Sequence, residues 1–333
     1  MLGIERKTHL RPPSQWVENL LIEADKKVTP KQLSAFVESW RRRDNKFLEK
    51  HLQPFRRLPT PQEEQVLNVA CDKTKELLRR HQLEKIQIDP SIVFILKEPF
   101  WARIGANEEE VGCFFNQRLM KAVAVRDSQP MGKMFLAVAA FHELLHLVSF
   151  RRARIYSKWK IFHQMQLERS GGISVANPQQ TFFCFLDEAV ALQLEKRFAQ
   201  SLMSEPLFED ECSRLKELQA NNPDAYYVVP TQEGEWAAGQ SYDYLTEDFE
   251  HFLDDIFHWQ PHPAKSREEI FAIFEKAFFS GRLLELARLI EKVYGKGSFR
   301  LLGEKTSNRI KSWKEDYFSQ FIVESSQFRH KQN

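Results

Sequence analysis

The chain has 333 residues, of which 42% are hydrophobic and 28% charged, and its formal net charge at pH 7 is +2. This composition predicts a soluble globular protein of about two or three domains or subdomains, long enough to bury a sizeable core. The small net charge argues against a dedicated nucleic-acid binder, although residues 41–43 and 151–152 are local arginine clusters.

Hydrophobic periodicity divides the chain into three regions. Residues 1–84 are expected to form a helical N-terminal region, with helical patterns over 15–50 and 61–82 separated by prolines. Residues 85–200 are expected to hold the functional core, which mixes strands and helices. Residues 201–333 again show mainly helical patterns.

Short segments rich in Ile, Val and Phe predict a small sheet in the central region. Residues 91–96 form one expected strand, and residues 111–115 and 119–125 form an expected hairpin. The segment 111–115 is the expected edge strand, and an edge strand can bind an extended peptide through main-chain hydrogen bonds. A second hairpin, over 159–167 and 173–175, is expected as an insertion that roofs a cleft.

The most informative feature is the pentapeptide His142–His146, which has the pattern HExxH and lies in a helical pattern over 131–150. Histidines four residues apart on a helix project from one face, so their imidazoles can converge on one metal ion. Glu143, beside the first histidine, can act on a metal-bound water. The helix is predicted to start at this point of the chain, with Ser128 as the capping residue and Pro130 inside the first turn.

A zinc ion needs a third protein ligand, with its fourth position left to water. The longer pattern HExxHxxGxxH is absent, because Ser149 and Arg152 stand where its Gly and last His would be. Glu188 is the better candidate, since it lies at the start of a second apolar helix that runs to about Phe198. Glu195 lies on nearly the same face two turns later, and is expected to be either an alternative ligand or a partner of a ligand.

An HExxH motif followed by a helix carrying (Asn/Asp)-Glu-(Gly/Ala)-x-Ala, here Asp187–Ala191, resembles the gluzincin group of zinc metallopeptidases. The resemblance implies an α+β fold with a zincin-like core, made of a small mixed sheet, an active-site helix and a glutamate helix. It implies that His142, His146 and Glu188 bind one Zn²⁺ per chain and that Glu143 is the general base. The implied activity is hydrolysis of a peptide or protein substrate through a metal-bound water.

The resemblance covers roughly residues 112–198, and the chain departs from the family pattern in two places. About forty residues separate His146 from Glu188, more than in compact members of the group. Leu192 stands where some members carry an acidic residue one turn after the glutamate ligand. This leaves the orientation of His142 without an obvious partner.

The resemblance also implies that residues 201–333 form a helical subdomain that is the other wall of the cleft and supplies a Tyr or His to stabilise the oxyanion. The sequence does not select one residue, and Tyr242 is only mildly favoured. The candidates are Tyr226, Tyr227, Tyr242, Tyr244, His251, His258 and His262.

Two hypotheses from different classes stay open. The first is a zinc-dependent endo- or aminopeptidase, and the second is a catalytically inactive zincin-like protein that binds a peptide or protein partner. No membrane span is expected, because charged and histidine side chains interrupt the longest apolar run. Four scattered cysteines without CxxC spacing and an N-terminus without an apolar stretch favour the cytoplasm. Substrate identity and oligomeric state are left open.

Overall fold

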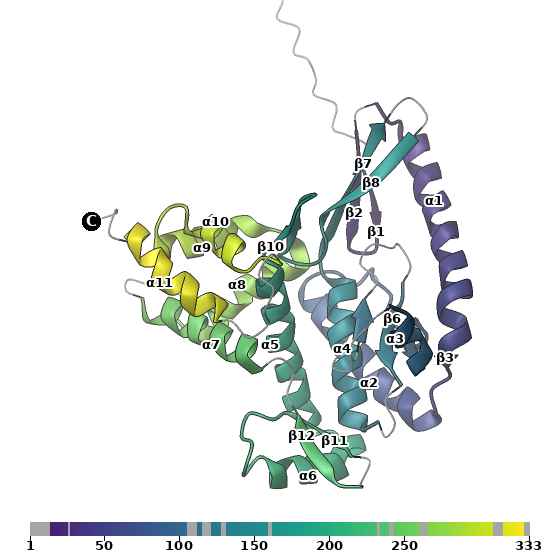
Figure 1. Ribbon diagram of the computed structural model, residues 1–333, viewed down its shortest axis with the longest axis vertical. Coiled ribbons are helices and arrows are strands. Elements are labelled where there is room, and N and C mark those ends of the chain that lie inside the picture. Colours follow the sequence, from purple (N-terminus) through teal and green to yellow (C-terminus); the bar gives the residue numbers. More distant parts are fainter. Residues whose placement is uncertain are drawn as a thin grey trace, which may run out of the picture.

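A computed structural model shows an α+β protein in which helices predominate and the strands form small sheets (Figure 1). It describes residues 14–25, 27–104, 112–114, 121–127, 131–158, 162–231, 234–239, 243–259, 265–308 and 316–329. Among the helices of these ranges, none combines the length and the apolar character needed to cross a bilayer.

The central sheet has the strand order β3-β4-β6-β5. Its strands are β3 (Arg56–Arg57), β4 (Val93–Leu96), β5 (Gly112–Phe114) and β6 (Val123–Arg126). β4 and β6 run parallel, whereas β5 is antiparallel to β6 and lies at the edge. The expected hairpin and its edge strand are therefore confirmed within the described residues, although the turn that joins them lies outside those residues.

Three helices pack together beside this sheet and build the main core: α2 (Pro61–Arg80), α4 (Lys133–Val148) and α5 (Cys184–Leu202). The central one, α4, is apolar on nearly every face, as a helix enclosed by neighbours should be. Every residue of α4 is buried except Lys133, His142 and His146. The two histidines therefore mark the one part of this helix, beyond its first turn, that solvent can reach.

The start of α4 differs from the sequence prediction. The residue before the helix is Gly132, which has no side chain to cap it. The carboxylate of Glu211, in α6 (Glu209–Leu218), instead accepts hydrogen bonds from the first two backbone N–H groups of α4, at 2.8 and 2.6 Å. The predicted cap at residues 128–130 lies outside the described residues. A cap more than 70 positions away cannot be found by a local motif.

A second sheet, with the order β1-β2-β7-β8, lies at the top of Figure 1 with helix α1 (Pro30–Phe47) beside it. Its strands are β1 (Ser14–Val17), β2 (Leu20–Ala24), β7 (Arg151–Lys158) and β8 (Phe162–Arg169). The predicted helix over 15–50 is therefore wrong before residue 30. The burial of β2 alternates along the strand, a period of two that the helical interpretation overlooked.

The predicted second hairpin is also displaced. Its two strands are β7 and β8, which begin and end earlier than the predicted 159–167 and 173–175. In β7, Arg152 and Arg154 point outward while Ala153 and Ile155 are fully buried. This alternation is difficult to recognise in the sequence, because the charged residues interrupt the apolar run that predicts a strand. Ion pairs of both arginines with acidic side chains on the neighbouring strands β2 and β8 make these charges compatible with a sheet.

The turn between β1 and β2 contains a buried asparagine that joins three separate segments. The Asn19 side-chain amide donates to the Val148 carbonyl at the end of α4, at 2.8 Å, and to the Phe279 carbonyl, at 2.9 Å. The carbonyl oxygen of Asn19 accepts from the Arg151 backbone N–H at 2.9 Å. The end of α4 is thereby tied to both the N-terminal hairpin and α8 (Arg267–Ser280).

The C-terminal part is a group of helices, at the left in Figure 1, that packs on the other side of α5. Besides α8, these helices are α7 (Asp243–His258), α9 (Leu283–Tyr294), α10 (Ser298–Lys305) and α11 (Tyr317–Arg329). Aromatic rings fill their interior, and the Phe252 and Phe318 rings stack with centroids 5.0 Å apart. This interior is continuous with the core around α4 and α5.

The remaining elements are short. They are a π-helical turn (Leu48–Leu52), 3-10 turns (Gln53–Phe55, Pro90–Ile92 and Pro206–Phe208), α3 (Glu98–Ile104), β9 (Val175–Ala176), β10 (Thr181–Phe182), β11 (Tyr227–Pro230) and β12 (Trp236–Gly239). β11 and β12 form a hairpin that packs with α6 at the bottom of Figure 1.

Candidate metal centre

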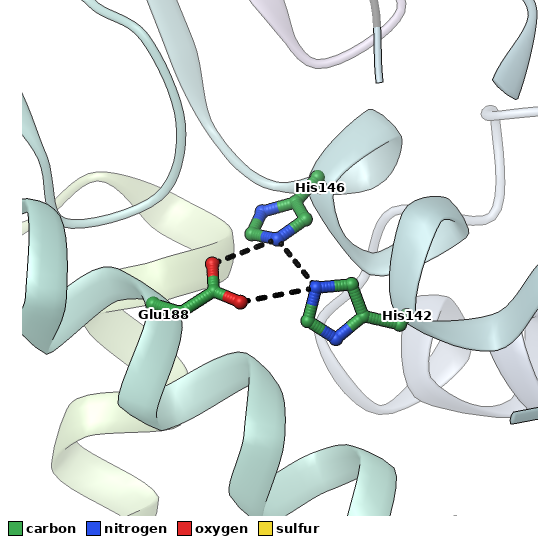
Figure 2. Close-up of side chains that lie close together, drawn as sticks. All are labelled: His142, His146 and Glu188. Carbon is green, nitrogen blue, oxygen red and sulfur yellow. Dashed lines mark hydrogen bonds and ion pairs between the residues drawn. The ribbon is translucent and has the colours of Figure 1, made fainter. Parts of the chain in front are cut away.

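Three side chains from two helices direct their donor atoms at one another (Figure 2). His142 and His146 lie one turn apart on α4, and Glu188 lies near the start of α5. The two histidine Nε2 atoms are 3.1 Å apart. Each Nε2 is 3.2 Å from one oxygen of the Glu188 carboxylate. The structure thus brings together the three residues that the sequence analysis named as ligands.

The chemistry and spacing of these donors fit a tetrahedral divalent metal ion. Two imidazoles and one carboxylate are a donor set of catalytic zinc sites. With zinc–ligand bonds of about 2.0–2.1 Å, neighbouring donors of a tetrahedral site lie about 3.3–3.4 Å apart. The observed separations of 3.1 and 3.2 Å are close to this value.

The triad is enclosed but not sealed. The side chains of His142, His146 and Glu188 are 13%, 17% and 16% exposed. A catalytic metal site must keep one position open to water or substrate, and a partly exposed triad meets that requirement.

Helix packing fixes the register of the two helices that carry the triad. The Phe141 ring of α4 stacks on the Phe198 ring of α5, with centroids 4.2 Å apart. The start of α5 is held by Asp187, a buried residue whose carboxylate accepts from the Ile173 backbone N–H at 2.6 Å. Burial raises the pKa of Asp187 to about 6. Glu188 therefore follows directly after a residue that is anchored in the core.

His142 uses both of its ring nitrogens. Its Nδ1 lies 2.7 Å from Oε2 of Glu195, a carboxylate that can only accept, so Nδ1 carries a proton while Nε2 faces the triad. Glu195 is 1% exposed, and its other oxygen accepts a hydrogen bond from the Tyr226 hydroxyl at 2.8 Å. Of the two roles expected for Glu195, the structure places it as a partner of His142. Leu192, where some gluzincins carry an acidic residue, is buried in the core.

The charges of the triad are strongly coupled. Burial by itself lowers the pKa of His142 and of His146, but Glu188 outweighs it for both, with help from Glu195 at His142, and both pKa values are raised. Burial by itself raises the pKa of Glu188, but the two histidines hold it far below its usual range. The carboxylate is therefore ionised and can supply negative charge to a bound cation.

Glu143 is buried beside the triad and against the edge strand. A Cβ atom built on Gly112 of β5 would overlap Oε1 of Glu143 and come within 2.7 Å of its Cγ. Only glycine at this position of the strand leaves room for the carboxylate in its present place. Burial raises the pKa of Glu143, which makes the carboxylate a better proton acceptor.

The structure separates the candidates for oxyanion stabilisation. Tyr226 is engaged with Glu195, and Tyr227 packs its ring on Phe135 with centroids 5.7 Å apart. His258 Nδ1 bonds the carbonyl of Asp254 one turn earlier in its own helix. Tyr244 and His251 are exposed on α7. The other two candidates, Tyr242 and His262, lie outside the described residues.

Sequence reasoning missed the Tyr226 contact, which joins residues 31 positions apart in different elements. It also missed the fit between Gly112 and Glu143, although the glycine lies in the strand predicted to form the edge. A glycine inside an otherwise apolar strand was the available signal, since it often marks a close approach to another group.

The chain matches no protein-family model, and no curated protein or solved structure matches it.

Proposed function

We propose that this chain is a zinc-dependent metallopeptidase of the gluzincin type, built on a zincin-like core. The observation that carries the proposal is the convergence of His142, His146 and Glu188 beside the buried carboxylate of Glu143. The arrangement of the central sheet supports it, because the antiparallel edge strand β5 lies directly against the helix that carries the HExxH motif.

His142, His146 and Glu188 would hold the zinc ion, which supplies Lewis-acid polarisation of the scissile carbonyl and lowers the pKa of a water molecule. The side chains of the chain supply the proton transfers. Glu143 accepts a proton from the attacking water and then delivers it to the leaving nitrogen of the substrate. Its burial favours this role, because burial raises the pKa of the Glu143 carboxyl group towards neutral pH.

The edge strand β5 is the proposed binding element for the substrate main chain. An extended peptide added to this edge would form backbone hydrogen bonds without reading a particular sequence. Because Gly112 of β5 contacts Glu143, a peptide bound at this edge would lie next to the general base.

We also propose a cytoplasmic location, which the cysteines support. Cys71, Cys184 and Cys212 are free thiols. Burial raises the pKa of Cys71 and of Cys184 to about 12, so these thiols are unreactive packing residues. Free thiols of this kind are typical of a reducing compartment.

The proposal is tested by measuring metal content and cleavage together. Protein purified without added metal should contain about one zinc per chain, as expected for a three-ligand site. It should cleave members of a peptide library, lose this activity to a chelator and regain it with zinc. Bound zinc without any cleavage would favour the alternative of an inactive peptide-binding module. Failure to bind zinc even when it is supplied would overturn the metal centre itself.

Replacing Gly112 with alanine should lower turnover without removing zinc. The new methyl group would displace the Glu143 carboxylate, and a misplacement near 1 Å can cost about 100-fold in rate. Steady-state kinetics of the zinc-loaded variant would measure the effect. Unchanged turnover in Gly112→Ala would contradict the assigned position of the base.

A further inference from the structure

The imidazole of His142, in α4, lies between two carboxylates that both belong to α5. Its Nε2 faces Glu188 at 3.2 Å, and its Nδ1 faces Glu195 at 2.7 Å. The two glutamates are two turns apart on one face of α5, so either carboxylate is a chemically suitable metal ligand. Something must therefore keep Glu195 on the far side of the ring while Glu188 faces the other triad atoms.

Tyr226 provides that restraint. Its hydroxyl donates to Oε1 of Glu195 at 2.8 Å, while Oε2 of the same carboxylate accepts from His142. Both oxygens of a carboxylate that is 1% exposed are thus engaged by donors, which offsets the cost of burying its charge. Rotation of Glu195 towards the triad would break both bonds at once.

The Tyr226 side chain is itself well fixed. It is 5% exposed, and its ring meets the Tyr227 ring edge-on with centroids 5.4 Å apart. Its backbone N–H donates to the carbonyl of Gly239, the last residue of β12, at 3.1 Å. The tyrosine therefore moves with the β11–β12 hairpin rather than with either helix of the triad.

The same hairpin belongs to a segment that contacts α4 at a second place. Residues 209–231 and 234–239, here called the clamp segment, include Glu211, whose carboxylate caps the start of α4. Gly132, just before α4, lies against the hairpin backbone, since a Cβ there would be 3.0 Å from the Val228 carbonyl oxygen. The clamp segment thus holds α4 at its first turn and, through Glu195, at His142.

We infer that Tyr226 is a positioning residue of the metal centre, acting through Glu195 to fix the tautomer of His142 and to keep Glu195 out of the coordination shell. This inference rests on the proposed zinc site. It assigns Tyr226 to the support of a ligand rather than to the oxyanion. It also makes docking of the clamp segment a condition for tight zinc binding.

The test is a zinc titration of the metal-free, full-length chain against a competing chromophoric chelator. Glu195→Gln should weaken zinc binding about 10–100-fold, as is usual when the hydrogen-bond partner of a histidine ligand is lost. Tyr226→Phe keeps the ring and should weaken zinc binding about 3–10-fold. This effect is smaller than that of Glu195→Gln, because Tyr226 is one hydrogen bond further from the histidine ligand than Glu195 is. In the double variant the loss should equal that of Glu195→Gln alone, because the tyrosine acts only through the glutamate.

Two further measurements separate positioning from general stability. Tyr227→Phe is the matched control, since it removes the hydroxyl of the adjacent tyrosine, and it should bind zinc like the wild type. Absorption bands of the cobalt-substituted protein should change in Tyr226→Phe and stay unchanged in Tyr227→Phe, because coordination is altered only in the former. The melting temperature of each metal-free variant would report any purely structural loss.

The outcomes distinguish the two proposals. Wild-type zinc affinity and an unchanged cobalt spectrum in Tyr226→Phe would overturn the inference and leave the peptidase proposal standing. So would a loss in the double variant that equals the sum of the two single losses. A wild-type chain that binds no zinc would overturn both.

Discussion

Glu143→Gln is expected to abolish peptide hydrolysis in a protein that still binds zinc. Glutamine has nearly the same shape, so it fits the space beside Gly112, but it cannot accept a proton. Loss of general acid–base catalysis should lower kcat by about 10²–10⁴-fold. The Glu143 carboxylate is not one of the three converging donors, so zinc content should remain at the wild-type level. The measurement is kcat and metal content on the same preparation.

Glu250→Gln is a suitable control for this variant. Glu250 is a partly exposed residue of α7 that pairs with Lys196 at 2.9 Å, and it takes no part in the triad. It makes the same chemical change without touching the general base, so near wild-type turnover is expected. A zinc-loaded Glu143→Gln protein that cleaves at the wild-type rate would exclude Glu143 as the base. Loss of zinc in that variant would instead make Glu143 a ligand.

Glu188→Ala should lose zinc. Glu188 supplies the only negative charge among the three donors, and its carboxylate faces both histidine Nε2 atoms. Removing a direct ligand should weaken binding by more than the roughly 100-fold upper range for partners outside the coordination shell. Metal content after dialysis and a competition titration would both detect the change. Hydrolysis should disappear with the metal.

The control for Glu188→Ala is Glu285→Ala, which removes an exposed carboxylate that pairs with Lys276 at the surface. This variant should retain full zinc content. If Glu188→Ala bound zinc as tightly as the wild type, the glutamate would not be a ligand, and Glu195 would become the residue to test next. Unfolding of the variant would be recognised by circular dichroism of the metal-free protein.

The sequence could predict those parts of the site that depend on the spacing of residues within one helix. His142 and His146 are four residues apart on one helix, so helical geometry alone places them on one face. Glu188 was found from its context at the start of a second apolar helix with small neighbours. The structure brings these three side chains together, although a long insertion separates them in the sequence.

The supporting contacts could not be predicted in the same way. Glu195 offered two roles, because its face of α5 could be inferred but not the side of His142 on which it would lie. The Tyr226 hydroxyl and the Glu211 cap come from elements whose docking no local periodicity encodes. At the N-terminus, short strands such as β2 depend on a parallel pairing with β7, more than 120 residues away.

The Asn19 side chain joins segments that leave the ribosome at very different times during synthesis. The Asn19 side-chain amide, in the turn between β1 and β2, donates both to the Val148 carbonyl at the end of α4 and to the Phe279 carbonyl in α8. During synthesis the helix with the histidines therefore leaves the ribosome well before α8, which carries the second carbonyl that this amide bonds. Phe279 lies 131 positions after Val148, so at about 5–20 residues per second it is synthesised roughly 7–26 seconds later. For that interval the helix that carries the histidines lacks its link to α8 through Asn19, so the proposed metal centre would mature only after most of the chain has emerged.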